Sequence, residues 1–531
     1  MQKSNSGSGI CSEEFLSAVE GKLKGRVQVQ LGVLGRAVLL ASSEKHRDVI
    51  AAMIAADNQT SIVAITGLDL GVNLGIYYHF RSQSGYYTVK VEVPKDNPHI
   101  QTITDLVPGA VFAEMEGNDL FGIVFDNHPS PGRLVLSENW PEGVYPLRKD
   151  VIANQVKLVP AKKAPEEIVD DTKTVKIIIG PQHPALIEPE KFSVSVEGEI
   201  VTKVEPRLGY VHRGVEKSAE SRTFIQDVYL VERICGICNG PHAWSFSGAV
   251  EKILDITIPR RAQFIRVITL ELNRIHSHLL VLGHAGLEIG YETLFQYFWR
   301  DREPIMDLIE LTCGNRVYES MITMGGVRRD LNETDSSKII GVLENLRTKI
   351  PFYKQLYEDE PTLQARMKGV GVLKREDAIS LGVVGPVARA SGYAVDVRKD
   401  APYEVYDEIP FKEIVYTEGD VWARMNVRMD EVEESINIIE YALNNLPKGA
   451  IKVDVPREIL KGEAINACEA PRGELFYYVK SNGTEMPERV KVRTPTFANL
   501  PSFFKTAIGG SIADVPANFV SLDPCFSCTD R

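Results

Sequence analysis

The sequence has no uninterrupted apolar run of the ~18 residues that a membrane-spanning helix needs. Its first residues also lack the basic start and apolar core of a secretory signal. There is no basic excess, because 72 acidic residues outnumber 60 basic ones and leave a net charge of −12. This balance argues against a nucleic-acid-binding protein. We therefore expect no nucleic-acid partner, and attachment to a membrane only through other subunits.

Cysteine is also sparse, because only seven of the 531 residues are cysteines. An odd, sparse set in a chain of this length is not typical of a secreted disulfide framework and favours a reducing compartment. Apolar residues make up 44% of the chain and charged residues 25%, which is the balance of an ordinary soluble globular protein. The length predicts roughly two to four domains with a sizeable core.

A charged, proline-containing stretch over residues 159–174 lacks apolar periodicity and predicts an interdomain linker. Before it, residues 12–158 show the mixed pattern of a small α+β domain. After it, residues 175–531 begin with strand-like segments and continue mostly with helical spacing. The predicted fold class is therefore α+β: a small N-terminal α+β domain, then a mostly α-helical domain that opens with a small sheet.

The spacing of apolar residues predicts the individual elements. Alternating and β-branched segments predict strands over residues 60–66, 75–81, 86–93, 175–179 and 192–204. Helical spacing predicts helices over residues 103–115, 261–282, 301–312, 335–359 and 422–446. In the segment 261–282 the apolar residues spread around most of the helix circumference, so we expect that helix to be buried.

Four cysteines form two Cys-x-x-Cys pairs, Cys235 with Cys238 and Cys525 with Cys528. Thiolates are soft ligands that suit zinc, copper(I), nickel and iron–sulfur clusters. Each pair alone is a weak indication, because the same spacing also serves structural zinc and dithiol redox chemistry. The wide gap between the pairs disfavours a small zinc knuckle, although structural zinc or an isolated four-iron cluster remains an alternative.

The residues that flank the pairs refine this interpretation. Gly236 would let the backbone come close to a metal, and Pro524 would fix the approach of the second pair. His242 follows Cys238 by four residues, so it lies one helical turn away and would orient the site as a hydrogen-bond donor. An ordinary core histidine is an equally good interpretation of His242.

Both pairs lie in segments that resemble the metal-binding motifs of nickel–iron hydrogenase large subunits. Residues 233–242, Arg-Ile-Cys-Gly-Ile-Cys-Asn-Gly-Pro-His, are similar to the first motif, and residues 523–528, Asp-Pro-Cys-Phe-Ser-Cys, to the second. The resemblance implies that all four cysteines hold nickel. It further implies two terminal nickel ligands, Cys235 and Cys525, and two bridges to an iron that carries carbon monoxide and cyanide, Cys238 and Cys528.

The resemblance extends to residues around the implied metals. Residues 469–473, Glu-Ala-Pro-Arg-Gly, are similar to the family segment that places an arginine over the metals, which makes Arg472 that arginine. Its guanidinium could donate hydrogen bonds to cyanide and exchange a proton. The alternative is a surface salt bridge just before the next strand. The resemblance also implies that Asp523 orients Arg472, and that Pro495 and Thr496 line the cyanide pocket.

Residues 180–189 resemble the opening segment of the membrane-bound, complex I-related hydrogenases, and Glu188 matches their proton-relay glutamate. A carboxylate suits this role because protons must leave a buried site through groups that load and unload near neutral pH. The alternative is an exposed, inert turn glutamate. Because Cys525 matches the family's usual proton acceptor, the implied proton path runs from Cys525 or Arg472 out through Glu188.

Other segments resemble two subunits of respiratory complex I. Residues 212–217, 271–278 and 325–330 are similar to its quinone-site large subunit, which lacks the nickel-binding cysteines. Residues 121–125 and 142–150 resemble its small peripheral-arm subunit, fused here ahead of the large subunit as in formate hydrogenlyase. We expect two histidines of the 261–282 helix and two further cysteines to be buried structural side chains: His276, His278, Cys313 and Cys468.

The resemblance implies the catalytic subunit of an energy-converting or formate hydrogenlyase-type nickel–iron hydrogenase, which reduces protons to hydrogen reversibly. The chain has no ferredoxin-type cysteine run, so electrons are expected from a small subunit with 4Fe-4S clusters and a ferredoxin-like subunit. Further expected partners are integral membrane subunits, and formate dehydrogenase or carbon monoxide dehydrogenase. The chain itself is expected at the cytoplasmic face of the cell membrane, as a peripheral part of a membrane-bound complex. The alternative is a metal-free quinone-site subunit of a complex I-like NADH or ferredoxin dehydrogenase.

Overall fold

The structure is a computed structural model, and it describes Phe15, Val19, Gly21 and residues 28–31, 37–83, 85–160, 173–183 and 186–531. The N-terminal part is built on a five-stranded sheet in the order β1-β2-β5-β4-β3. Its strands are β1 (Gln28–Leu31), β2 (Ala37–Leu40), β3 (Ser61–Asp69), β4 (Asn73–Ser82) and β5 (Gly85–Pro94). Strands β2 and β5 pair in parallel, and the other neighbours are antiparallel.

Among the described residues that follow β1, two α-helices and several short elements complete this domain. They are α2 (His46–Ala56), β6 (His99–Gln101), η2 (Pro108–Ala110), α3 (Val111–Phe121), β7 (Val124–Asp126) and η3 (Ala153–Gln155). Apolar side chains of α2, including Val49, Ile50 and Met53, belong to the same buried core as Ile76 and Tyr78 of β4. The helix therefore covers one face of the sheet, as expected for an α+β domain.

The prediction of a helix over residues 103–115 was wrong at its start. Residues Ile103 to Val107 form turns, with Leu106 N and Val107 N donating to Ile103 O at 3.0 and 2.8 Å. Pro108 then opens η2, and α3 follows from Val111. Proline lacks a backbone donor and disfavours helical geometry in the residue before it, so a helix begins at or after such a position. The three strands predicted over residues 60–93 are confirmed by β3, β4 and β5.

The second part opens with a three-stranded antiparallel sheet and is then mainly helical. The sheet consists of β8 (Thr174–Ile179), β9 (Lys191–Glu197) and β10 (Ile200–Arg207). The helices are α4 (Val215–Ala219), α5 (Phe224–Glu232), α6 (Asn239–Leu254), α7 (Arg260–Ile289), α8 (Glu292–Cys313), α9 (Glu333–Asp359), α10 (Pro361–Met367), α11 (Arg375–Ser380), α12 (Gly385–Ala390), α13 (Val397–Asp400), α14 (Val421–Asn444), α15 (Pro495–Ala507), α16 (Val515–Val520) and α17 (Phe526–Asp530).

Smaller elements connect these helices. They are the hairpin of β11 (Ile322–Thr323) and β12 (Gly326–Val327), the antiparallel sheet β13 (Gly462–Ala470), β14 (Gly473–Ser481) and β15 (Pro487–Arg493), and η4 (Ile512–Asp514). The α+β fold class is confirmed. The segment predicted as sheet over 192–204 is a hairpin, β9 and β10, that turns at Gly198 with a φ of +61°.

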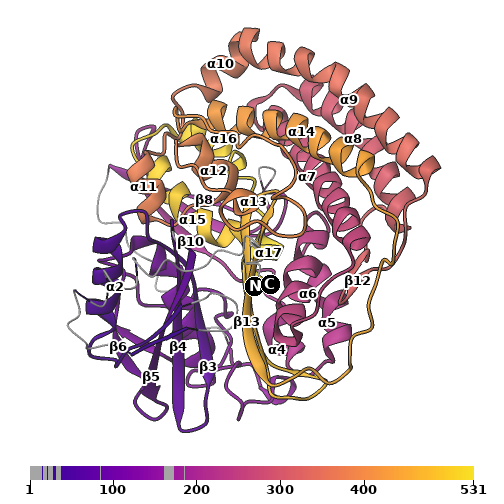
Figure 1. Cartoon of the computed structure of the whole chain (residues 1–531). Coiled ribbons are helices and arrows are strands. Elements are labelled where there is room, and N and C mark those ends of the chain that lie inside the picture. Colours follow the sequence, from indigo (N-terminus) through magenta and orange to yellow (C-terminus); the bar gives the residue numbers. More distant parts are fainter. Residues whose placement is uncertain are drawn as a thin grey trace.

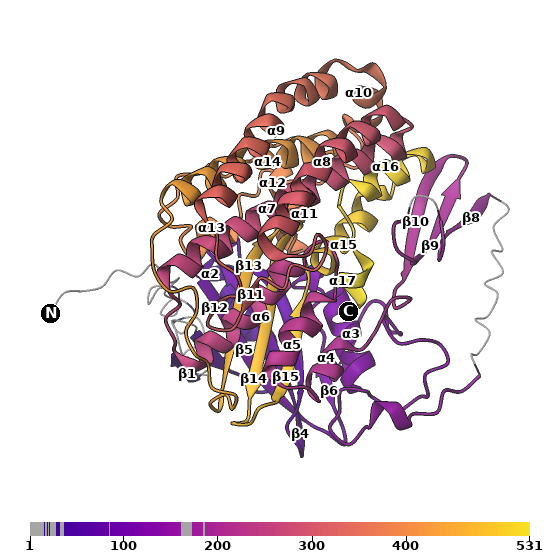
Figure 2. The same cartoon turned by 90° about the vertical axis from the view of Figure 1, so that its right-hand side faces the viewer.

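The sheet β13-β14-β15 lies between the N-terminal domain and helices α4 to α6, and the long helices α7, α8, α9 and α14 stack beyond (Figure 1). Turned by 90°, the view shows β8, β9 and β10 at one side, near α15 and α17 (Figure 2). The two domains meet through a small apolar cluster of Val63, Ala64, Leu68, Tyr77, Phe476 and Tyr478. A buried ion pair between Arg81 Nη1 and Glu474 Oε2, at 2.9 Å, joins them as well.

Helix α7 is the centre of the second domain. Every residue from Phe264 to Gly283 is buried, which confirms the prediction of a buried helix over 261–282. Apolar residues lie around most of its circumference, and buried polar side chains such as Arg266 and Glu271 are paired; α7 packs against α8 and α14. The helices predicted over 301–312 and 335–359 lie within α8 and α9, and the one predicted over 422–446 matches α14 except for its last two residues.

The predicted linker falls mainly on residues 161–172, which lie outside the described residues. The domain boundaries therefore stay a prediction. Within the part of the chain that the structure describes, no helix is both long and apolar enough to cross a membrane.

Candidate metal centre

The fold brings the two cysteine pairs together from opposite ends of the second domain. Cys525 Sγ lies 3.4 Å from Cys235 Sγ, and Cys238 Sγ lies 3.4 Å from Cys528 Sγ. Each of the four residues is at most 5% exposed. Sulfur atoms at such distances, enclosed by protein, form a compact donor set for a soft metal.

The first pair lies in the turn between α5 and α6. Helix α5 begins with a capping box in which Thr223 and Gln226 exchange side-chain and backbone hydrogen bonds, and it ends at Arg233. Cys238 is the N-cap residue of α6, and Ile237 N donates to Cys235 Sγ at 3.3 Å. The thiols therefore lie at a helix N-terminus, where backbone N–H groups favour the ionised form of a ligand.

The second pair lies at the start of α17. Asp523, with a left-handed φ of +55°, turns the chain just before Pro524, and Cys525 is the N-cap residue of the helix. Thr496 Oγ1 accepts a hydrogen bond from Cys525 N at 3.2 Å. Thr494 Oγ1 donates to Cys528 O at 3.0 Å. Thr496 thus touches the loop of the second cysteine pair, and Pro495 is buried beside it at the first position of α15. The lining of a cyanide pocket by either residue stays a prediction.

His242 lies one turn into α6 and touches both a thiol and a buried tyrosine. Its Nε2 lies 3.6 Å from Cys528 Sγ, and its Nδ1 lies 2.6 Å from the hydroxyl of Tyr477. Burial lowers the pKa of His242 to about 4, so the ring is neutral near pH 7. His242 is thus a buried core histidine that also contacts a cysteine, so each of the two interpretations of this residue is correct in part. The sequence analysis did not single out Tyr477. The only indication in the sequence is the alternation along β14, which places Tyr477 on the same buried face of the strand as Leu475.

Arg472 is buried beside the cysteines, so the alternative of a surface salt bridge was wrong. Its side chain is 2% exposed. Its Nε donates to Asp523 O at 2.7 Å, and its Nη2 pairs with Asp523 Oδ1 at 2.8 Å. Asp523 and the nearby thiols raise the pKa of Arg472 well above its usual value, although burial opposes them. Among the described residues, Arg472 Nη1 has no hydrogen-bond partner, which leaves one donor free.

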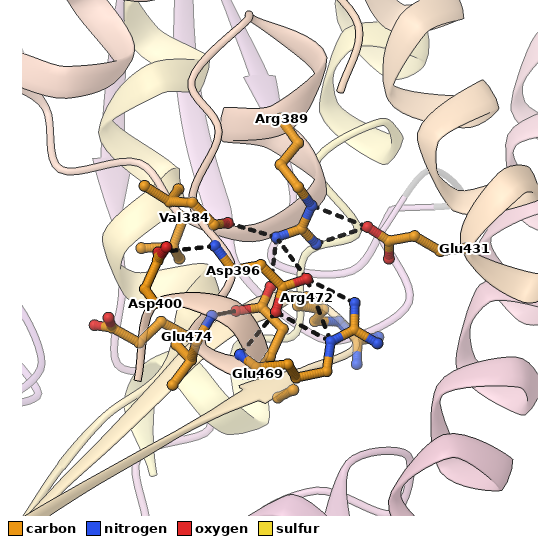
Figure 3. Close-up of polar contacts among 12 residues, drawn as sticks. Val384, Arg389, Asp396, Asp400, Glu431, Glu469, Arg472 and Glu474 are labelled. Carbon is orange, nitrogen blue, oxygen red and sulfur yellow. Dashed lines mark hydrogen bonds and ion pairs between the residues drawn. The ribbon is translucent and has the colours of Figure 1, made fainter. Parts of the chain in front are cut away.

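A buried ion network supports the turn that carries Arg472. This turn joins β13 to β14, and Gly473 lies there with a φ of +124°. A Cβ on Gly473 would meet Gly385 N at 2.7 Å, so the backbone of α12 covers the turn directly. Arg389 lies between Glu431 and the end of β13 (Figure 3); its Nη2 pairs with Glu431 at 2.7 Å and its Nη1 with Glu469 at 2.8 Å. No local sequence motif predicted this network.

Glu188 holds the loop between the last two cysteines, which makes the alternative of an exposed, inert glutamate wrong. Its Oε2 accepts a hydrogen bond from Ser527 N at 2.8 Å, and its Oε1 accepts one from Ser527 Oγ. The residue is half-buried, while its neighbour Ile187 is 53% exposed. A carboxylate that reaches from this edge of the protein to the cysteine loop has the position that a proton relay requires.

The four thiols influence one another strongly. Hydrogen bonds from Cys238, Cys525 and Cys528 lower the pKa of Cys235 well below its usual value. The contact with Cys235 raises the pKa of Cys238 and Cys525, and burial raises that of Cys528. One thiolate thus forms at the expense of the others. Four thiolates in so small a buried volume need a cation to balance their charge.

The remaining predictions on buried side chains are confirmed. His276 is buried, with Nε2 at 3.0 Å from Ile237 O and Nδ1 at 2.9 Å from Arg302 Nη2. His278 is buried with Nε2 at 2.8 Å from Glu431 Oε2. Cys313 and Cys468 are also buried and lie outside the thiol groups that could hold a metal.

Three family descriptions match the chain. "Respiratory-chain NADH dehydrogenase, 30 Kd subunit" matches residues 39–157. "Nickel-dependent hydrogenase" matches residues 213–285, and "Respiratory-chain NADH dehydrogenase, 49 Kd subunit" matches residues 288–461 and 457–531. The segments follow one another along the chain, so a single chain joins a 30-kDa-type part to a part that is shared between hydrogenases and complex I.

Individual proteins give the same two-sided similarity. The C/D subunit of NADH-quinone oxidoreductase from Bacteroides fragilis is 36% identical over 501 residues, 88% of this chain and 94% of that protein. Formate hydrogenlyase subunit 5 of Escherichia coli is 36% identical over 471 residues, 87% of this chain and 83% of that protein. Membrane-bound hydrogenase subunit alpha of Pyrococcus furiosus is 42% identical over 373 residues, 67% of this chain and 87% of that protein.

A solved structure agrees with this result. A chain in the structure of the membrane-bound sulfane sulfur reductase, described as an archaeal respiratory membrane complex, matches with a TM-score of 0.66 and 34% identity. The match covers 68% of this chain and all of that chain.

Proposed function

Since this chain belongs to the family that unites fused complex I subunits of the 30-kDa and 49-kDa types with the large subunits of nickel-dependent hydrogenases, we propose that it is a hydrogenase catalytic subunit of the formate hydrogenlyase type. The proposed reaction is the reversible reduction of protons to hydrogen. One observation carries the proposal: four buried cysteines, from motifs at opposite ends of a domain, place their sulfur atoms in contact.

The residues present fit a nickel–iron centre. All four cysteines, Cys235, Cys238, Cys525 and Cys528, would hold this centre. Four thiolates in this volume would need a cation, and the free Nη1 of Arg472 is a donor suited to an anionic iron ligand such as cyanide. When bound, such a centre supplies the making and breaking of the H–H bond, with electrons from iron–sulfur clusters in a partner subunit.

The protein's own groups handle the proton. The Cys525 thiolate is the proposed proton acceptor. The Arg472 guanidinium, which is already protonated, is proposed to stabilise charge beside it, and Asp523 fixes the guanidinium through two contacts. Glu188 receives the proton at the loop between Cys525 and Cys528, which it holds through Ser527. Burial of the cysteines keeps bulk water away from this exchange.

Partners and location follow as proposals from the same family. The similar proteins include subunits of hydrogenases and of a respiratory membrane complex. We propose a small 4Fe-4S subunit, a ferredoxin-like subunit and integral membrane subunits as partners, at the cytoplasmic face of the cell membrane. The electron source is proposed to be formate dehydrogenase or carbon monoxide dehydrogenase.

A second candidate is a metal-free redox subunit of a complex I-like NADH or ferredoxin dehydrogenase. It is favoured by the fused C/D proteins of NADH-quinone oxidoreductase, which match over as much of the chain as formate hydrogenlyase subunit 5 does. The native complex, purified without oxygen, separates the two. We expect hydrogen evolution with a chemically reduced dye; quinone reduction without hydrogen evolution would establish the second candidate instead.

A further inference from the structure

The helix that carries the last two cysteines cannot hold its own position. Helix α17 has five residues, Phe526–Asp530, and an isolated helix of that length is unstable in water. It contains Cys528 and follows directly on Cys525. Its place beside the first cysteine pair therefore depends on contacts with the rest of the protein.

Besides the contacts of Thr494, Thr496 and Glu188, several are made by Arg531, which follows the helix. Arg531 is 2% exposed, and its carbonyl oxygen accepts hydrogen bonds from Arg213 N at 3.4 Å and Val215 N at 3.2 Å. Its guanidinium pairs with Glu216 of α4 at 3.3 Å and, more closely, with Glu116 of α3. Glu116 belongs to the N-terminal domain, so that domain contacts the metal-holding segment through one buried carboxylate.

Two cations from β15 complete the cluster. Lys491 pairs closely with Glu116 and lies 3.6 Å from Glu216, and Arg489 pairs with Glu216 at 2.7 Å. Two carboxylates therefore face three cations, and all five side chains are largely buried. If Glu116 lost its charge, Lys491 and Arg531 would depend on Glu216, which Arg489 already occupies, with Asp530 as a further negative charge near Arg531. Like charges that are buried without enough counter-charge repel one another.

The region around these ion pairs is not tightly packed. A cavity of about 30 Å³ adjoins Glu116, Glu216 and Arg531 and extends to His212 and Lys217. A space of this size has room for about two water molecules. The side of Arg531 that faces the N-terminal domain is therefore held mainly by charge, which makes it sensitive to a change at Glu116.

We propose that Glu116 is a positioning residue of the metal centre: through Arg531, the N-terminal domain fixes α17 and with it Cys525 and Cys528. The inference rests on the proposed function for its link to metal, whereas its mechanical part concerns α17 alone. The fused 30-kDa-type domain then contributes to metal retention although it supplies none of the four cysteines.

The test compares Glu116→Gln with a matched control, Arg81→Met. The control removes the buried Arg81–Glu474 ion pair between the same two domains but touches neither α17 nor Arg531. Hydrogen–deuterium exchange of amides 526–531 is measured in metal-free protein, and nickel loss to a chelator in loaded protein. We expect Glu116→Gln to speed both by roughly tenfold, the effect typical of residues that orient metal ligands, and Arg81→Met to speed neither.

Two further variants distinguish loss of the Glu116–Arg531 contact from general unfolding of the protein. Arg531→Met is expected to reproduce Glu116→Gln, and the double variant to be no worse than either single one, because all three break the same contact. Equal exchange at 526–531 in Glu116→Gln and Arg81→Met would overturn the inference. If wild-type protein holds no nickel, the proposed function fails, while the exchange measurement on metal-free protein still decides the role of Glu116.

Discussion

Replacing Arg472 by lysine tests the link between the buried guanidinium and turnover. Arg472 makes two contacts with Asp523, through Nε at 2.7 Å and Nη2 at 2.8 Å, and leaves Nη1 free. Lysine keeps the charge but has one nitrogen, so it can restore only one of these positions. Both side-chain contacts of Arg472 go to Asp523 rather than to a cysteine, so we expect metal to assemble in Arg472→Lys.

The size of the effect follows from the lost hydrogen bonds. One buried hydrogen bond to a charged group contributes about 1.5–3 kcal/mol, and each 1.36 kcal/mol changes a rate about tenfold. Losing one contact with Asp523 therefore lowers turnover by about 10–100-fold. Loss of the free Nη1, if it stabilises charge that develops during reaction, costs a further factor of about 10²–10³. The two factors multiply to an expected total loss of at least about 10³-fold.

The assay measures hydrogen evolution per bound nickel, so that a fall in metal content is not mistaken for a fall in turnover. Arg81→Lys is the matched control, because Arg81 is also buried and paired with a carboxylate but lies at the domain interface. We expect this control to evolve hydrogen at close to the wild-type rate. Near-normal turnover per nickel in Arg472→Lys would remove Arg472 from the mechanism.

Three other changes test separate parts of the account. Glu188→Gln should slow hydrogen evolution but leave the infrared bands of carbon monoxide and cyanide in place; shifted bands would make Glu188 structural. Cys238→Ser should lower nickel and iron content at least tenfold, whereas Cys468→Ala should not, and equal loss in both would point to a general folding defect. Burial raises the pKa of Glu114 to about 7 from 4.5, so its contribution to stability is complete below about pH 4.5 and is lost as the pH rises through 7. Glu114→Gln should therefore flatten the free energy of unfolding between pH 5 and 8, measured by denaturant titration; an unchanged slope would contradict the assignment.

Much of the fold was predictable because it depends on local patterns. The spread of apolar residues around α7 predicted a buried helix. The alternating and β-branched residues of three segments predicted β3, β4 and β5. The helix predicted over 103–115 failed because Pro108 overrides the apolar spacing before it. The domain boundaries stay a prediction, since residues 161–172 lie outside the described residues.

The centre of the candidate site was also predictable, because two short motifs carry the four cysteines. Its surroundings were not, because they depend on contacts between residues far apart in sequence. Arg472 could be taken for a surface residue until Gly385 was seen to cover its turn. Tyr477 and Arg389 belong to no motif, and each reaches the site only through the packing of β14 or α12. The roles of Arg472 and Glu188 remain proposals that the experiments above address, and those of Asp523, His242, Pro495 and Thr496 remain predictions.

The most direct test of the central claim is the metal content of the native complex, purified without oxygen, together with its infrared spectrum. The account predicts about one nickel and one iron per chain beyond the partner clusters, with bands of carbon monoxide and cyanide. No structural zinc site or simple iron–sulfur cluster has such bands. Protein without stoichiometric nickel and without these bands would contradict the claim that the four cysteines hold a nickel–iron centre.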